Sequence, residues 1–387
     1  MPRSDGDRVA IIGIGIYPHG RHPGVSAATM GIDAIRKALA DAGVTWGEIE
    51  FAAGGSMVSG MPDSVVGDLG LTGVPFINVR NACATGASTL LAASTALRAG
   101  DAELAVVVGY DKHERGAFSA PPELLGVADW YAAQGLMLTP QFFAMKIQRY
   151  MHDYGISAST LAKVAAKAYR NGALNPTAFR RTPMSERHIA SSAMITPPLT
   201  QYMYCSPDEG AVAAVLATER KAAELGVEPI YLRSVALRTR SYGSLEVFGT
   251  SVSLADTPPP TTPAAEAAFA QAGLTPTDVD IAQLSDGEAG AEVMGMAETG
   301  LCAHGAQEEL IQQGQTELDG SLPVNTDGGL IANGEPVGAN GLRQVHETVL
   351  QLRGQAGQRQ VPNDPQVGFT QVYGAPGVAA CTVLAKS

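Results

Sequence analysis

The chain resembles itself, and this internal repeat limits the folds it can adopt more than any other feature of the sequence. The segment "ALADAGVTWGEIEFA" (38–52) aligns without a gap with "AFAQAGLTPTDVDIA" (268–282). Both have the pattern of a helix end, a glycine cap, a turn and a strand. A second pair follows, "ACATGASTL" (82–90) and "GEPVGANGL" (334–342). We therefore predict two duplicated halves of similar structure.

Short apolar runs alternate with alanine-rich helical segments, which is the pattern of an α/β protein. "RVAIIGIGI" (8–16) and "AELAVVVGYD" (102–111) have the composition of buried strands. The stretch at about 116–200 differs, because aromatic, proline and basic residues are frequent in it. We interpret it as an insertion that covers another part of the molecule. The prediction is an N-terminal half, 1–222, that includes this loop domain, and a C-terminal half, 223–387.

Length and composition exclude several classes of protein. The chain has 387 residues, of which 45% are hydrophobic and 17% charged, as in ordinary globular proteins. Its formal net charge of −12 argues against a nucleic acid as the main partner. The apolar run near the N-terminus is too short for a secretory signal, and no stretch approaches the ~20 apolar residues of a membrane span. We expect a cytoplasmic protein that does not enter a membrane.

The four cysteines are too far apart in sequence to form a metal-binding cluster, so we expect no metal and no disulfide framework. They are Cys83, Cys205, Cys302 and Cys381. The default interpretation of each is a small buried hydrophobic residue. Cys83 departs from it, because it stands at the start of a predicted helix. The free N–H groups and partial positive charge of a helix N-terminus favour a thiolate, so Cys83 is a candidate nucleophile.

The repeat aligns Cys83 with Glu335, and if the halves pack around a pseudo-two-fold axis the two residues face each other. As a carboxylate, Glu335 raises the pKa of the thiol and can accept a proton from it or from a substrate hydroxyl. As a neutral acid, with a pKa raised by burial and by Asp286 or Glu288, it can donate to an oxyanion. A third interpretation is that Glu335 only caps its own helix.

Several motifs resemble those of the thiolase superfamily, and most of all its sterol-carrier-protein type and lipid-transfer-protein relatives. They include "NACATGASTLLAASTALRAG" (81–100), "DEGAVAAV" (208–215) and "GGLIANGEPVGANGL" (328–342). The resemblance implies the thiolase fold, with two βαβαβαββ halves in five layers (αβαβα) and a loop domain that receives coenzyme A. It also implies a tight homodimer.

The resemblance further implies ping-pong acyl transfer, with Cys83 as the acyl acceptor and coenzyme A as a co-substrate rather than a tightly bound cofactor. The N–H groups of Cys83 and of Gly374 in "QVYGAPG" are the expected oxyanion hole. Two motifs depart from the family. Gly-His-Pro reads Gly334-Glu335-Pro336, and a segment that usually carries a histidine or asparagine reads Ser285-Asp286-Gly287-Glu288. The second oxyanion site therefore lacks its usual donors, and both familiar second-cysteine positions lack cysteine, one of them being Val372.

Three functions remain open. The first is thiolysis of a 3-oxoacyl-CoA through acyl-Cys83, with Glu335 in place of the histidine. The second is retro-aldol cleavage of a 3-hydroxyacyl-CoA, as in steroid side-chain aldolases of the lipid-transfer branch. Their expected tyrosines are missing from "LSDGEAG" and "NGEPVG", and Tyr373 is the nearest tyrosine in a motif. The third is a degenerate thiolase that serves as a non-catalytic subunit. We favour thiolysis, and we expect that a small partner with an OB fold and a zinc ribbon can complete the site.

Overall fold

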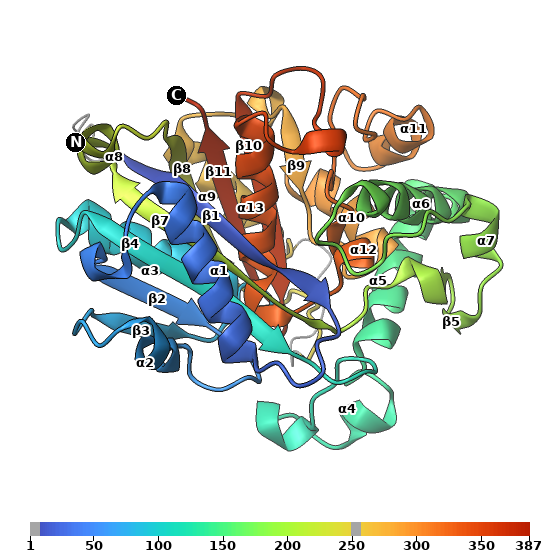
Figure 1. The fold of residues 1–387 in the computed structure, drawn as a ribbon. Helices are drawn as coiled ribbons and strands as arrows, with labels where there is room; N and C mark the ends of the chain where they lie inside the picture. Colours follow the sequence, from blue (N-terminus) through green and yellow to red (C-terminus); the bar gives the residue numbers. More distant parts are fainter. Residues whose placement is uncertain (1–7, 249–256) are drawn as a thin grey trace.

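The structure, a computed structural model, describes residues 8–248 and 257–387 (Figure 1). Its strands are β1 Val9–Gly20, β2 Phe51–Gly55, β3 Phe76–Val79, β4 Leu104–Lys112, β5 Met194–Thr196, β6 Leu199–Thr200, β7 Glu209–Thr218, β8 Ile230–Thr239, β9 Ile281–Gln283, β10 Val367–Gly374 and β11 Val378–Ala385. Its α-helices are α1 Ala27–Ala42, α2 Val66–Leu69, α3 Thr85–Ala99, α4 Trp130–Ala133, α5 Thr139–Tyr154, α6 Ala158–Leu174, α7 Glu186–Ala190, α8 Glu219–Leu225, α9 Thr261–Ala272, α10 Ala289–Glu298, α11 Ala306–Gln312, α12 Gly329–Asn333 and α13 Asn340–Leu352.

The main sheet has the strand order of a duplicated unit, β3-β2-β4-β7-β1-β8-β11-β10-β9. On one side of β1, β1 pairs antiparallel with β7 and β7 pairs antiparallel with β4. Strand β4 then pairs parallel with β2, and β2 pairs parallel with β3. On the side of β8, β8 pairs antiparallel with β11 and β11 pairs antiparallel with β10. Strand β10 then pairs parallel with β9, and a single parallel bridge joins Ala282 of β9 to Val324. The halves join where β1 meets β8. The repeated order confirms the predicted duplicated α/β fold.

The aligned segments of the repeat also adopt the same local structure. Helix α1 ends at Gly43, which has the left-handed conformation, and a capping box of Thr45 and Glu48 follows. Helix α9 ends at left-handed Gly273, and a capping box of Thr275 with an aspartate follows. A parallel strand, β2 or β9, comes next in each half. The same cap, turn and strand therefore occur twice in the chain.

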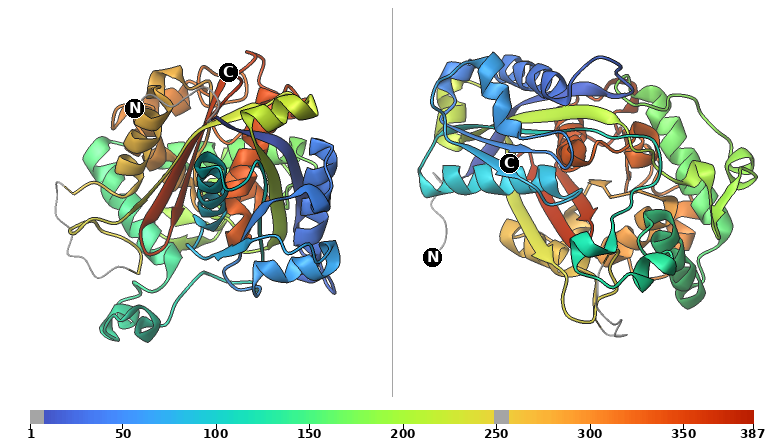
Figure 2. Two further views of the ribbon diagram at one scale, coloured as in Figure 1. Left: turned by 90° about the vertical axis from the view of Figure 1, so that its left-hand side faces the viewer. Right: turned by 90° about the horizontal axis from the view of Figure 1, so that it is seen from below.

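Two helices are enclosed between the halves of the sheet. Figure 2 shows α3 and α13 side by side at the centre, with strands on both sides. Leu90 and Leu97 of α3 share one apolar cluster with Val345 and Val349 of α13. Helix α1 covers the outer face of one half, while α9 and α10 cover that of the other. This arrangement gives the five predicted layers and brings the ends of α3 and α13 together.

The segment between β4 and β7 carries α4 to α7 and lies at one end of the molecule (Figure 1). It is joined firmly to the C-terminal half. The buried ammonium of Lys167 on α6 forms an ion pair with Glu292 on α10. The guanidinium of Arg180 donates to the carbonyl oxygen of Ile331 at 2.9 Å. The chain then crosses from one half-sheet to the other through α8.

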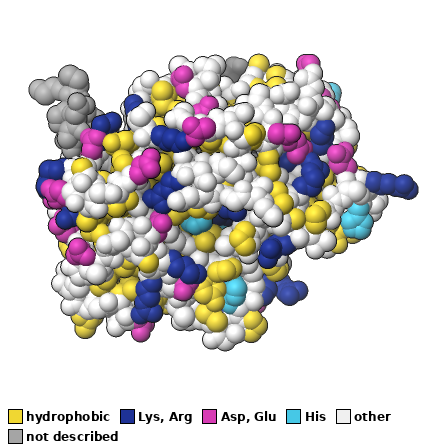
Figure 3. Space-filling model, turned by 45° about the horizontal axis from the view of Figure 1, so that its top comes forward, with side chains coloured by type: hydrophobic (Ala, Val, Ile, Leu, Met, Phe, Trp, Pro, Cys, Tyr) yellow, Lys and Arg dark blue, Asp and Glu magenta, His cyan; other side chains and the backbone are white. Residues whose placement is uncertain are grey.

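The molecular surface is mixed in charge on the face that Figure 3 presents, where basic side chains stand among acidic and apolar ones. Within residues 8–248 and 257–387, no helix combines the length and apolar character needed to cross a bilayer. The same residues contain no group of three or more histidine, cysteine, aspartate or glutamate side chains placed to hold a metal ion.

Candidate active site

Cys83 and Glu335 face each other where the two central helices begin. Cys83 lies in the turn before α3, preceded by Ala82, which has a left-handed φ of 48°. Glu335 lies between α12 and the short 3-10 turn η7 (Val337–Ala339). The Cys83 thiol donates to Oε1 of Glu335 at a sulfur–oxygen distance of 2.8 Å. The two positions that the repeat aligns are therefore hydrogen-bonded to each other.

The absence of side chains at two glycines allows this meeting of helix ends. A Cβ at Gly86 would lie 2.8 Å from the backbone nitrogen of Leu342. A Cβ at Gly341 would lie 2.7 Å from the backbone nitrogen of Ala87. Real Cβ atoms do not approach backbone so closely, so a larger residue at either place would force α3 and α13 apart.

Burial raises the pKa of the Cys83 thiol well above its ordinary value, and the negative charge of Glu335 raises it further. The sequence suggests two opposing effects, a helix end that favours the thiolate and a carboxylate that opposes it. The second effect and burial prevail, because the thiol is desolvated and 2.8 Å from a carboxylate oxygen. The resting site therefore holds a thiol hydrogen-bonded to a carboxylate, and not a preformed thiolate.

Gly374, at the end of β10, packs against the turn that carries Cys83. A Cβ at Gly374 would lie 3.0 Å from the backbone nitrogen of Cys83 and 2.9 Å from the carbonyl oxygen of Asn81. The backbones of Gly374 and Cys83 are thus adjacent. Close approach of these two backbones is what the predicted oxyanion hole requires.

The predicted acidic partners lie at the ends of other helices. Asp286 accepts from the backbone N–H groups of Leu330 at 2.6 Å and Ile331 at 3.3 Å, in the first turn of α12. Glu288 is the N-cap of α10 and accepts from Gly290 N–H at 2.5 Å. Burial raises the pKa of Glu288 to about 8 and that of Asp286 well above its ordinary value. Each carboxyl therefore has a capping contact that accounts for its position.

Ser285 and Tyr373 also contact groups other than Cys83 and Glu335. The backbone N–H of Ser285 donates to the side-chain oxygen of Gln371 at 3.0 Å. The Tyr373 hydroxyl donates to Glu246 at 2.6 Å, and the Lys146 ammonium lies 5.8 Å from the centre of its ring. Successive side chains of a strand point to opposite faces, so Tyr373 projects away from the side on which Gly374 meets the cysteine turn.

Cys205, interpreted from the sequence as a buried hydrophobic residue, belongs to this site. Its thiol donates to Oε2 of Glu335 at 3.2 Å, and the residue is only partly buried. Burial and the charge of Glu335 raise its pKa well above the ordinary value. One signal was available in the sequence, since Cys205 stands in "YCSPDEG", directly before the strand that returns from the insertion.

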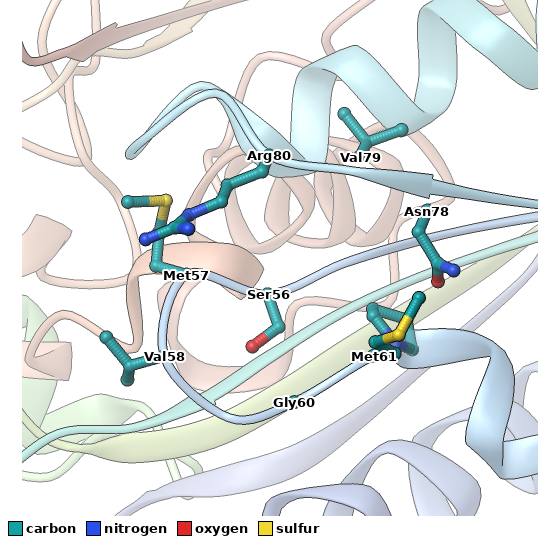
Figure 4. A pocket seen from close by; sticks show the side chains of 9 residues that line it. Ser56, Met57, Val58, Gly60, Met61, Asn78, Val79 and Arg80 are labelled. Atoms are coloured by element: carbon teal, nitrogen blue, oxygen red, sulfur yellow. The ribbon is translucent and has the colours of Figure 1, made fainter.

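A pocket of about 340 Å³ is lined in part by residues 78–80, which precede the cysteine turn in the chain. Its lining residues are Ser56, Met57, Val58, Gly60, Met61, Pro62, Asn78, Val79 and Arg80. Figure 4 shows Met57 beside Arg80 at one end and Met61 near Asn78 at the other. Buried Asp111 connects this wall to the site, because it accepts from Met57 N–H at 2.9 Å and from Gly338 N–H at 2.7 Å.

Comparison with known proteins agrees with this architecture. Residues 9–182 match the family model of the thiolase N-terminal domain, and residues 253–387 match the model described as thiolase C-terminal domain-like. The chain is 30% identical over 390 residues to acetyl-CoA acetyltransferase of Methanothermobacter thermautotrophicus, which covers 98% of this chain and 99% of that protein. It is 30% identical over 403 residues to sterol carrier protein 2 of Oryctolagus cuniculus, with 97% of this chain and 71% of that protein covered.

The solved structure of the Ltp2-ChsH2(DUF35) aldolase superposes with a TM-score of 0.87 at 24% identity, covering 99% of each chain. The fold is therefore the thiolase fold that the motifs imply. The chain belongs to the thiolase superfamily, in the branch of the sterol-carrier-protein-type thiolases and their lipid-transfer-protein relatives.

Proposed function

We propose that this protein cleaves the C2–C3 bond of a 3-oxoacyl-CoA by thiolysis, with Cys83 as nucleophile and Glu335 as its base. The observation that carries the proposal is the 2.8 Å hydrogen bond between the Cys83 thiol and Oε1 of Glu335. A carboxylate in that contact can take the thiol proton when sulfur attacks. A purely capping glutamate would have no reason to engage a cysteine of another helix.

The reaction proceeds in two acyl-transfer steps. Sulfur of Cys83 attacks the C3 carbonyl while Glu335 takes its proton, and the N–H groups of Cys83 and Gly374 bind the oxyanion. The C2–C3 bond then breaks, and the electron pair left on C2 takes up a proton, which gives acetyl-CoA and returns Glu335 to its carboxylate form. The shortened acyl group remains on Cys83 as a thioester. A coenzyme A thiol, deprotonated by Glu335, attacks this thioester, and Cys83 leaves and recovers its proton.

Intact-mass measurement after incubation with 3-oxooctanoyl-CoA tests this proposal. Wild-type protein and Cys83→Ala are compared, with Cys302→Ala as a matched control at a partly buried cysteine outside the site. We expect the mass of one hexanoyl group on the wild type and on Cys302→Ala, and none on Cys83→Ala. Absence of both an adduct and cleavage in the wild type, measured with and without an added OB-fold partner, would refute the proposal and favour a non-catalytic subunit.

Retro-aldol cleavage of a 3-hydroxyacyl-CoA is the second candidate, and the superposition on a structure named as an aldolase favours it. In that reaction Glu335 would take the proton of the substrate hydroxyl, and no acyl group would reach Cys83. The Cys83→Ala variant separates the two candidates. If Cys83→Ala still releases a carbonyl product from a 3-hydroxyacyl-CoA, and the wild type forms no acyl adduct, the reaction is retro-aldol cleavage and not thiolysis.

We infer that a second copy of the chain covers β3, so that the working form is a homodimer. This strand is at the edge of the sheet and exposes Ile77, and the nearby residues Met61 and Leu71 are exposed as well. An open apolar edge invites pairing with another chain. Light scattering at micromolar concentration is expected to give twice the chain mass, and a stable monomer would contradict the inference.

A small partner subunit is also proposed, of the OB-fold and zinc-ribbon kind. The superposed aldolase is named for two components, Ltp2 and ChsH2(DUF35). In this chain Glu335 stands where the family has histidine and Ser285 where it has histidine or asparagine, so the usual donors to a second oxyanion are missing. Asp286 caps α12, and Glu288 caps α10 through one of its two oxygens. Activity that appears only after such a partner is added would support it, and full turnover of the isolated chain would remove the need for one.

A further inference from the structure

The carboxylate of Glu335 is shared by two thiols from different parts of the chain. Oε1 accepts from Cys83 at 2.8 Å, and Oε2 accepts from Cys205 at 3.2 Å. Glu335 is 5% exposed, while both cysteines are partly exposed. A carboxyl group that takes a proton from one sulfur can therefore release it to the other after turning about its Cγ–Cδ bond.

Backbone hydrogen bonds fix Cys205 relative to this carboxylate. Its own N–H donates to the Gly287 carbonyl oxygen at 3.0 Å. The carbonyl oxygen of Tyr204 accepts from Arg180 at 2.8 Å, and that of Ser206 accepts from the backbone N–H of Glu335 at 2.9 Å. Cys205 and the residues before and after it are thus each fixed by a backbone hydrogen bond. The bond to Ser206 comes from Glu335 itself.

Cys381 shows what a space-filling cysteine looks like in the same molecule. It lies within β11, is 0% exposed and is one member of an apolar cluster. Cys205 is different in each respect, because it is partly exposed, lies in a loop and directs its thiol at an ionisable group. Packing alone does not account for that geometry.

Carbon–carbon cleavage requires a proton donor at C2 as well as a base for Cys83. When the C2–C3 bond breaks, the electron pair left on C2 must take up a proton. Glu335, the base that activates Cys83, receives the thiol proton on Oε1, the oxygen that contacts Cys83. Burial and Glu335 raise the pKa of Cys205, so its thiol carries a proton at neutral pH, as a donor must.

We propose that Cys205 donates the proton that C2 takes up, an inference that rests on the thiolysis proposed above. The Cys83 proton passes to Oε1 of Glu335 as sulfur attacks C3. As the C2–C3 bond breaks, the proton of the Cys205 thiol goes to C2, and the proton held by Glu335 passes to the Cys205 sulfur. Glu335 is again an anion, Cys205 is again a thiol, and the acyl group is on Cys83.

The test separates acylation from carbon protonation in Cys205→Ala and Cys205→Ser, with Cys302→Ala as the control. Acylation of Cys83 by hexanoyl-CoA needs no proton at carbon and is followed by intact mass. Thiolysis of 3-oxooctanoyl-CoA, and uptake of deuterium from D₂O at C2 of acetyl-CoA, both require the donor. We expect acylation within about threefold of wild type, but thiolysis and deuterium uptake reduced on the order of 10²-fold.

The possible results assign the failure to one proposal or the other. Wild-type rates of thiolysis and deuterium uptake in Cys205→Ala would overturn the role of Cys205 and leave acyl-Cys83 chemistry intact. Equal loss of acylation and thiolysis would give Cys205 a structural role and also overturn it. A wild-type protein that accepts no acyl group on Cys83, even with an added OB-fold partner, would instead refute thiolysis itself.

Discussion

The thiol of Cys83 and the carboxylate of Glu335 are 2.8 Å apart and occupy equivalent places in the two halves of a duplicated fold. Each half contributes one helix, and the helix ends meet because glycines let the backbones touch. The pairing keeps the nucleophile protonated until substrate arrives, since burial and Glu335 both raise the pKa of the thiol. Activation therefore depends on proton transfer during attack.

The first prediction is that Glu335→Gln changes two properties of Cys83 in opposite directions. Removal of the negative charge lowers the pKa of the thiol, because Glu335 is one of the causes that raise it. At a pH below that pKa the thiolate fraction rises, and we expect alkylation by iodoacetamide at pH 8 to become at least about tenfold faster. Thiolysis is expected to fall on the order of 10²-fold, because the base is gone.

Cys302 is the internal control for this measurement, since its pKa of about 11 results from burial alone. Its alkylation rate should be the same in both proteins. A Glu335→Gln variant that alkylates more slowly at Cys83, or retains wild-type thiolysis, would contradict the assigned roles.

The second prediction concerns the contact between Gly374 and the cysteine turn. In Gly374→Ala the new Cβ would meet the Cys83 nitrogen at 3.0 Å and the Asn81 oxygen at 2.9 Å, so the turn must shift. We expect a loss of about 10²- to 10³-fold in kcat, the scale of a lost oxyanion donor. In the control Gly295→Ala, the new Cβ has its nearest neighbour at 3.7 Å, and kcat should be unchanged.

The third prediction is that the ion pair between Lys167 and Glu292 anchors the insertion. Both side chains are at most 1% exposed, and Asn325 donates to the same carboxylate at 2.7 Å. Lys167→Met leaves a buried charge without its partner, and we expect the free energy of unfolding to fall by about 3–5 kcal/mol. Lys163→Met on the same helix, where the ammonium donates to the carbonyl oxygen of Gln312, is expected to cost less than about 0.5 kcal/mol. Denaturant unfolding of both variants measures the difference, and equal effects would refute the anchor.

The duplicated fold and the pairing of Cys83 with Glu335 could both be predicted, because both follow from the alignment of the two repeats. Alignment of the two helix starts predicts Cys83 opposite Glu335, and the hydrogen bond between them agrees with that prediction. Cys205 has no counterpart in that alignment. It reaches Glu335 only because the chain returns from the insertion at this point, a long-range contact without a local pattern. Sequence also cannot tell a catalytic acid from a capping one, and Asp286 and Glu288 accept from backbone N–H groups of helices that periodicity alone did not locate.

The last prediction is a pH dependence of stability due to Glu288. Burial raises its pKa in the folded chain to about 8, against an ordinary value of 4.5. Between these values the folded state holds a proton that the unfolded state has released, so the stabilisation present below pH 4.5 is lost as the pH rises toward 8. Glu288→Gln cannot titrate. As the pH rises from 5 to 8, the free energy of unfolding of the wild type should therefore fall by up to about 1.4 kcal/mol per pH unit relative to this variant.

Urea unfolding at pH 5, 6, 7 and 8 measures this difference. Glu309 is exposed, and Glu309→Gln is the control variant that should follow the wild type. A constant gap between wild type and Glu288→Gln across this range would show that Glu288 is already ionised in the folded protein.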